Sequence, residues 1–183
     1  MAYFFNRILF SMFCWENLVD ELAGIALKPL KYILPRIVYK LNLFGSIKKH
    51  YTSFEEFVNE KEHLYKDLTY NLDYGSSSYQ SKGALVVSMM PYFMLLIATN
   101  KYLGILPMPY IPFNLWLIIA GVLSSFVVHY FCLKNDKYKT YFKKFKNNKN
   151  NTKWHFVCLL YIIGACVACY WAIILFNADY FGI

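Results

Sequence analysis

The hydrophobic positions of this chain are concentrated in three long runs, which cover residues 84–105, 112–133 and 154–176. About 20 apolar residues, at a rise of 1.5 Å per residue, cross the roughly 30 Å hydrocarbon core of a bilayer. A helix of a soluble protein keeps a polar face, whereas these runs are apolar on all sides. The pattern therefore predicts an all-α integral membrane protein with three transmembrane helices.

Residues 1–83 carry a different pattern, in which apolar and charged positions alternate at helical spacing. It predicts an N-terminal amphipathic helical region, distinct from a transmembrane domain of residues 84–183. In residues 1–27, Arg7 and three acids interrupt the apolar positions. Charges are costly in hydrocarbon, so we expect a helix at the membrane interface or packed on the spans. A fourth membrane-embedded segment is the alternative.

Residues 28–50 combine apolar positions with six lysines and arginines. This combination is typical of a basic helix on an anionic membrane surface, and a solvated basic face is the alternative. Ser53 and Glu56 then have the spacing of a helix N-cap, in which each side chain bonds the backbone N–H of the other residue. Residues 74–83, rich in Ser and Gly, have the composition of a flexible linker.

Lysine and arginine are distributed unevenly along the chain, whose formal net charge is +8. Residues 134–153 hold eight lysines and one acid, whereas the loop 106–112 between the first two spans holds no basic residue. The positive-inside rule then predicts a cytoplasmic N-terminus, a cytoplasmic basic loop 134–153 and an outside C-terminus. We expect the inner membrane of a bacterium, with most polar residues in the cytoplasm.

The basic loop is also a candidate contact surface. Lysines beside a membrane usually hold anionic lipid headgroups, so nucleic-acid binding is the less favoured interpretation. The residues that we expect to contact headgroups or a cytoplasmic protein partner are Lys137, Lys143, Lys144 and Lys146.

Two His-x-x-Cys pairs flank the basic loop, His129 with Cys132 and His155 with Cys158. Residues three apart share a helix face, so the two pairs have the residue types of a tetrahedral zinc site. The loop between them is long and neither pair is a C-x-x-C. We therefore favour interfacial histidines and buried reduced thiols, with no cofactor, and keep the metal site as the alternative.

Small residues four apart allow membrane helices to approach closely. Gly121 with Ser125 and Gly164 with Ala168 have this spacing and are the expected helix-packing positions. Three spans form a small bundle, so we also expect these faces to support a homo-oligomer.

The chain contains no catalytic motif of the common hydrolase, metalloprotease, nucleotide-binding or dinucleotide-binding types, and we do not expect an enzyme. The leading hypothesis is a protein that self-associates and acts at the membrane as a pore or channel-like effector. The polar positions within the spans are then the candidate pore-lining residues, Ser88, Asn114, Ser124 and Ser125. The alternative is a non-catalytic membrane anchor or accessory subunit that docks a cytoplasmic protein.

Overall fold

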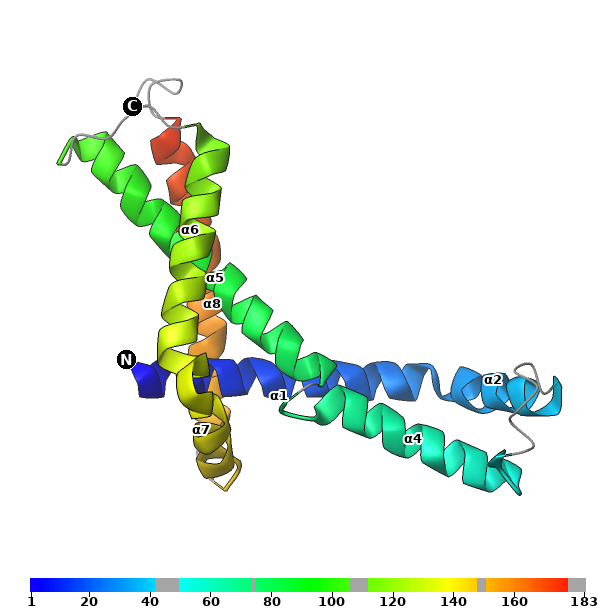
Figure 1. Cartoon of the computed structure of the whole chain (residues 1–183). Helices are drawn as coiled ribbons and strands as arrows, with labels where there is room; N and C mark the ends of the chain where they lie inside the picture. Colours follow the sequence, from blue (N-terminus) through cyan, green and yellow to red (C-terminus); the bar gives the residue numbers. More distant parts are fainter. Residues whose placement is uncertain (42–49, 74, 106–111, 148–150, 178–183) are drawn as a thin grey trace. The chain divides into compact units, whose positions relative to one another are not determined.

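A computed structural model describes residues 1–41, 50–73, 75–105, 112–147 and 151–177, and the described residues form helices and turns without strands (Figure 1). The helices are α1 (Ala2–Ala26), α2 (Lys28–Leu41), α4 (Phe54–Tyr70), α5 (Ser76–Leu103), α6 (Phe113–Val128), α7 (Lys137–Lys146) and α8 (Asn151–Phe176). Most of the predicted loop 106–112 and the C-terminal residues 178–183 lie outside the described residues.

Among the described helices, three are long and apolar enough to cross a membrane: α5, the stretch that begins with α6, and α8. The prediction of a helical, multi-pass integral membrane protein is thus supported. The predicted linker is wrong for residues 76–83, because α5 already begins at Ser76. Three of its four serines, Ser77, Ser78 and Ser81, are buried rather than solvated, and the Ser78 hydroxyl donates to the carbonyl oxygen of Leu72 at 2.9 Å.

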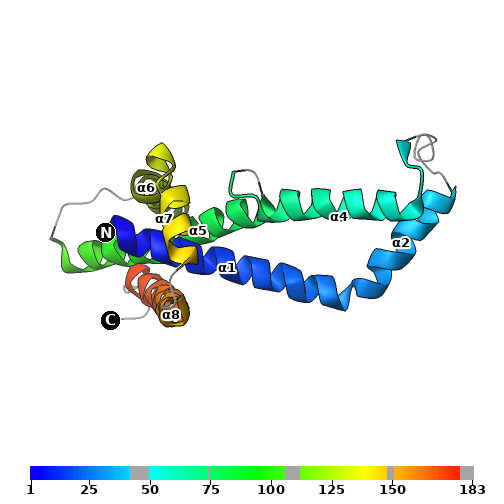
Figure 2. The same ribbon diagram turned by 90° about the horizontal axis from the view of Figure 1, so that it is seen from below.

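The chain divides into two compact units, which are described separately. The first unit comprises Met1–Met12 and Ser81–Ile183, so the first half of α1 groups with the candidate spans. Helix α5 crosses α6 and α8 obliquely (Figures 1 and 2). The three helices pack around an apolar core that combines small and large side chains. Its buried residues are Met94, Ala98, Trp116, Ala120 and Ala172.

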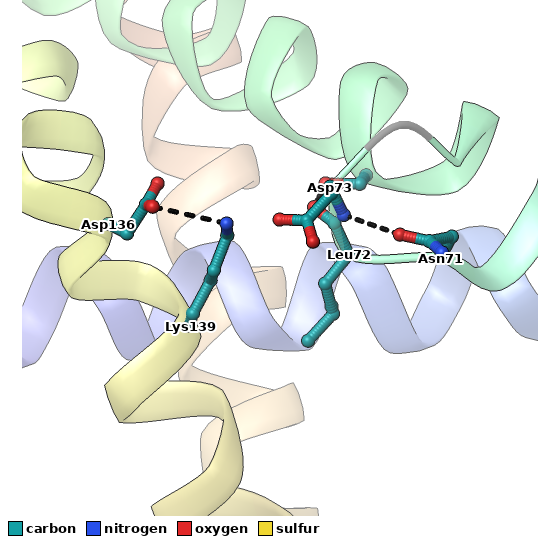
Figure 3. Close-up of polar contacts among 6 residues, drawn as sticks. Asn71, Leu72, Asp73, Asp136 and Lys139 are labelled. Carbon is teal, nitrogen blue, oxygen red and sulfur yellow. Dashed lines mark hydrogen bonds and ion pairs between the residues drawn. The ribbon is translucent and has the colours of Figure 1, made fainter.

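A short irregular connection joins α6 to α7, and the chain continues in the same general direction (Figure 1). A π-helical turn, His129–Leu133, extends α6, and Asn135 and Asp136 then adopt positive φ angles of 59° and 53°. Asn and Asp tolerate this left-handed conformation better than other non-glycine residues. The Asp136 carboxylate forms an ion pair with Lys139 Nζ at 3.1 Å (Figure 3). Ten residues of the predicted basic loop are therefore an ordered helix, α7.

The second unit, Phe13–Gln80, contains the second half of α1 together with α2 and α4. Ser53 caps α4 as predicted, since its hydroxyl accepts from the backbone N–H of Glu56 at 3.1 Å. The expected reciprocal bond differs, because the Glu56 carboxylate accepts from the backbone N–H of Thr52 at 2.8 Å. After α4, the Asn71 side-chain oxygen accepts from the N–H of Asp73 and closes a turn (Figure 3).

Helix α4 packs on α2 through aromatic side chains. The ring of Tyr39 lies 5.6 Å from that of Phe54 and 5.7 Å from that of Phe57. The guanidinium of Arg36 lies over the Phe54 ring at 5.9 Å. One face of α2 is therefore covered by α4.

Candidate functional site

The first unit contains a buried arginine. Arg7 is 1% exposed and is the one charged side chain among the buried polar residues that the structure describes. Its guanidinium carbon lies 3.8 Å from the centroid of the Phe145 ring and 5.6 Å from each of the Tyr3 and Trp154 rings. We call these three rings the aromatic cage of Arg7.

Two oxygen acceptors complete the surroundings of Arg7. Its Nε donates to the Tyr3 hydroxyl at 3.2 Å, and a terminal nitrogen donates to the Asn151 side-chain oxygen at 2.9 Å. The Asn151 amide in turn donates to the carbonyl oxygen of Phe145 at 3.2 Å, near the end of α7. Asn151 thus links the end of α7, the beginning of α8 and the N-terminal helix.

The site buries the positively charged guanidinium of Arg7 among aromatic rings and neutral oxygens. Within the described parts of the chain, no carboxylate forms an ion pair with Arg7. The faces of aromatic rings attract a cation, and this attraction strengthens when water is excluded. A guanidinium stays charged in proteins, so the cage and the two oxygens must compensate its lost hydration. The arrangement holds α1 on α7 and α8.

Two neighbouring contacts attach the same half of α1 to the candidate spans. The Asn6 amide donates to the carbonyl oxygen of Phe131 in the π-helical turn at 3.0 Å. The Cys158 thiol donates to the carbonyl oxygen of Ile8 at 3.9 Å. The ring of Phe10 packs edge-on against that of Phe142, at 5.0 Å between centroids.

In the sequence pattern, Arg7 is only an interruption of apolar residues, and nothing singles out Asn6 or Asn151. The available signal was an arginine four residues after a tyrosine, since that spacing places both on one helix face. The partners from α7 and α8 are more than 130 residues away in the chain, and no local pattern connects them to Arg7.

The structure does not bring the two His-x-x-Cys pairs together as a metal site. Among the residues that it describes, no group of three or more His, Cys, Asp and Glu side chains has a metal-binding arrangement. Cys132 and Cys158 are fully buried, whereas His129 is exposed. The Cys158 thiol is directed at the Ile8 carbonyl, as described above.

The two small-residue pairs have different surroundings. A Cβ atom added at Gly164 would lie 2.6 Å from the Tyr92 hydroxyl, which donates to the Tyr161 carbonyl oxygen at 2.6 Å. Gly164 therefore provides the space in which α5 packs on α8, and Ala168 is buried. At Gly121 the nearest atom is Met90 Cε at 3.5 Å, an ordinary contact, and Ser125 is exposed.

The four polar residues proposed to line a pore also separate into two groups. Ser124 is fully buried, and the Ser88 hydroxyl donates to the Leu85 carbonyl oxygen of its own helix at 3.0 Å. Asn114 and Ser125 are exposed, as is His129. Ser125 and His129 follow Asn114 by about three and four helical turns, so the three lie near one face of α6. We call Asn114, Ser125 and His129 the outer row of α6.

Helix α7 separates its aromatic side chains from most of its lysines. Tyr138, Phe142 and Phe145 are buried, whereas Lys143, Lys144 and Lys146 are exposed. Lys137 is half-buried, and its ammonium donates to the Tyr130 carbonyl oxygen at 3.3 Å. Three of the four predicted contact lysines therefore lie on an exposed face of an ordered helix.

In the second unit, burial raises the pKa of the Cys14 thiol from an ordinary value of 9.0 to about 11. Because the thiolate is the reactive form, we expect Cys14 at pH 8 to react about 100-fold more slowly with N-ethylmaleimide than an unperturbed thiol. Peptide mass spectrometry of the folded protein in detergent would measure the rate. The SDS-unfolded chain is the control, and equal rates in both states would contradict the prediction.

Comparison of the chain with protein-family models, with curated proteins and with solved structures finds no match in any of the three.

Proposed function

We propose that this protein is a non-catalytic, self-associating membrane protein whose oligomer acts as a pore or channel-like effector. The observation that supports it is the outer row of α6, in which Asn114, Ser125 and His129 are exposed on a candidate span. A polar side chain that faces lipid is unfavourable, whereas a second helix or a water-filled axis satisfies it.

The packing inside one chain favours the same proposal. Gly164 already packs against α5 and Ala168 is already buried within the chain, while Ser125 is exposed. Small and hydroxyl side chains let membrane helices approach closely and form hydrogen bonds across the contact. Copies that meet through α6 would therefore place the outer row around a shared axis.

The proposed orientation follows from the lysines. The N-terminal region and residues 134–153 lie in the cytoplasm, and the C-terminus lies outside, in the inner membrane of a bacterium. The exposed lysines of α7 would then contact the anionic headgroups of the inner leaflet.

Substitution of Ser125 by leucine tests the self-association. The larger apolar side chain fits lipid but prevents the close approach of two α6 helices. We expect native mass spectrometry from nanodiscs to change from one closed oligomer to the monomer. The conductance of planar bilayers that contain the variant should fall about tenfold. A loss of about 1.4 kcal/mol in the free energy of association lowers the association constant tenfold, and the conductance follows the amount of oligomer.

Val167→Leu is the matched control, because Val167 is an exposed residue of α8 outside the outer row. It should leave both the mass and the conductance unchanged. A wild-type protein that is strictly monomeric in both mild detergent and lipid would refute the proposal.

A second candidate function is a membrane anchor that docks a cytoplasmic protein. The exposed Lys143, Lys144 and Lys146 on an ordered helix favour it, because a fixed row of charges can select an acidic partner surface. Reversal of these three charges to glutamate should abolish partner binding and leave membrane insertion intact. Under the pore hypothesis, the same variant keeps its oligomeric mass.

A further inference from the structure

The second unit carries an apolar stripe that α4 does not cover. In α1, Leu18, Leu22 and Ile25 recur at helical spacing, and each is more than half exposed. In α2, Leu30, Ile33 and Leu34 are also more than half exposed, and Ile37, which follows at i+7, is 47% exposed. The whole set of exposed residues is Leu18, Val19, Leu22, Ile25, Leu27, Leu30, Ile33, Leu34, Ile37 and Leu41.

The stripe is nearly continuous along the chain. Only Leu27 separates α1 from α2, and its backbone N–H still bonds the Ala23 carbonyl oxygen at 2.9 Å. Leu27 is itself exposed. An uncovered apolar surface that extends over two helices is larger than a folded domain normally leaves to water, and it marks an interaction surface.

The contacts of α2 show which side the stripe occupies. Tyr39 and Arg36 pack on α4, as described above. At 3.6 residues per turn, Leu30, Ile33, Leu34 and Ile37 lie on the opposite side of the helix from Tyr39. The apolar stripe is therefore directed away from α4, whose other face carries the exposed ion pair of Glu62 and Lys66, at 2.9 Å between their charged atoms.

The charges beside the stripe identify its partner. Helix α2 contains four basic residues and no acid. In α1, Asp20 lies on the side opposite Leu18 and accepts a hydrogen bond from the Ser77 hydroxyl at 3.0 Å, whereas the exposed Glu21 borders the stripe. Residues 18–41 therefore hold four basic residues and two acids, a net positive charge beside a leucine-rich face, which is the chemistry of a helix that lies in the interface of an anionic bilayer.

The connectivity supplies that bilayer. Helix α5 begins in this unit and continues as a candidate span, so the stripe is covalently tethered to a membrane. A tether raises the effective concentration of the surface and favours even a weak interfacial contact. We propose that residues 18–41 lie in the interface of the anionic leaflet, with the apolar stripe among the acyl chains. This contact is independent of self-association through α6.

An environment-sensitive fluorescent amino acid in place of Ile33, introduced by amber suppression into the full-length chain, tests this proposal. Nanodiscs of equal parts phosphatidylcholine and phosphatidylglycerol would carry either ordinary or brominated acyl chains. We expect brominated chains to quench the emission about two-fold, because interfacial helices bury their apolar face about 5–10 Å into the boundary. Nanodiscs of phosphatidylcholine alone should give weaker quenching.

The same fluorophore in place of Asn59, an exposed residue on the opposite face of α4, is the matched control, and we expect no quenching there. If emission at position 33 is unquenched and water-like, the stripe is exposed to solvent and the proposal is wrong. If it is unquenched and blue-shifted, a second copy or another protein segment covers the stripe, and the proposal is equally wrong. Equal quenching without phosphatidylglycerol would overturn the preference for an anionic surface.

Discussion

Substitution of Arg7 by alanine is expected to lower the free energy of unfolding by about 2–4 kcal/mol and to release the first half of α1. The variant loses the cation–π contacts of the aromatic cage and two hydrogen bonds from a charged donor, and each is worth about 1–3 kcal/mol when buried. The cost of burying the guanidinium offsets part of that sum. Denaturant titration in detergent micelles measures the free energy, and limited proteolysis reports the release of the N-terminus.

Arg36→Ala is the matched control for this experiment, because Arg36 is exposed and its guanidinium contacts one ring. Surface substitutions usually change stability by about 0.5 kcal/mol or less. Arg7→Lys keeps the charge but loses the planar guanidinium, which stacks on the rings and donates to two acceptors. It should therefore lower the free energy of unfolding by an intermediate amount. Equal midpoints for Arg7→Ala and Arg36→Ala would show that the cage does not hold α1.

Substitution of Gly164 by alanine is the second large effect. The new Cβ atom would lie 2.6 Å from the Tyr92 hydroxyl, so Tyr92 must move and lose its hydrogen bond to the Tyr161 carbonyl. Overpacking of this kind costs about 1–3 kcal/mol. We expect a loss in that range in the same titration, with the oligomeric mass unchanged.

Gly121→Ala is the control for Gly164→Ala, because its Cβ atom would meet only Met90 Cε at an ordinary distance. It should leave stability unchanged or raise it by up to about 1 kcal/mol, because alanine favours a helix more than glycine does. Tyr92→Phe removes the hydroxyl that clashes, so the double variant Gly164→Ala/Tyr92→Phe should lose less than the sum of the single losses. Strict additivity would mean that Tyr92 is not the obstacle.

The two glycines show that the spacing of small residues predicts helix packing only in part. Gly121 and Gly164 have the same spacing to a small residue, and both were predicted to pack helices. Only the neighbours distinguish them, since the Tyr92 hydroxyl lies over Gly164 and the terminal methyl group of Met90 lies near Gly121. Tyr92 is 72 residues away from Gly164 in the chain, so helical spacing alone cannot assign it.

The predicted linker failed for a related reason. Serine and glycine favour turns when their polar groups compete for local hydrogen bonds. In residues 76–83, Ser77 instead finds a partner brought by the fold, because its hydroxyl donates to the Asp20 carboxylate. Composition describes what residues prefer in isolation, and tertiary contacts reversed that preference.

The sequence by itself determined the three candidate spans and the N-cap of α4. The spans follow because hydrocarbon accepts only long apolar helices, and the cap follows because Ser53 satisfies a backbone N–H three residues away. Only the tertiary structure decided the burial of Arg7, the packing role of Gly164 and the uncovered stripe of α1 and α2. Each depends on which distant side chains meet, and that is set by the packing of whole helices.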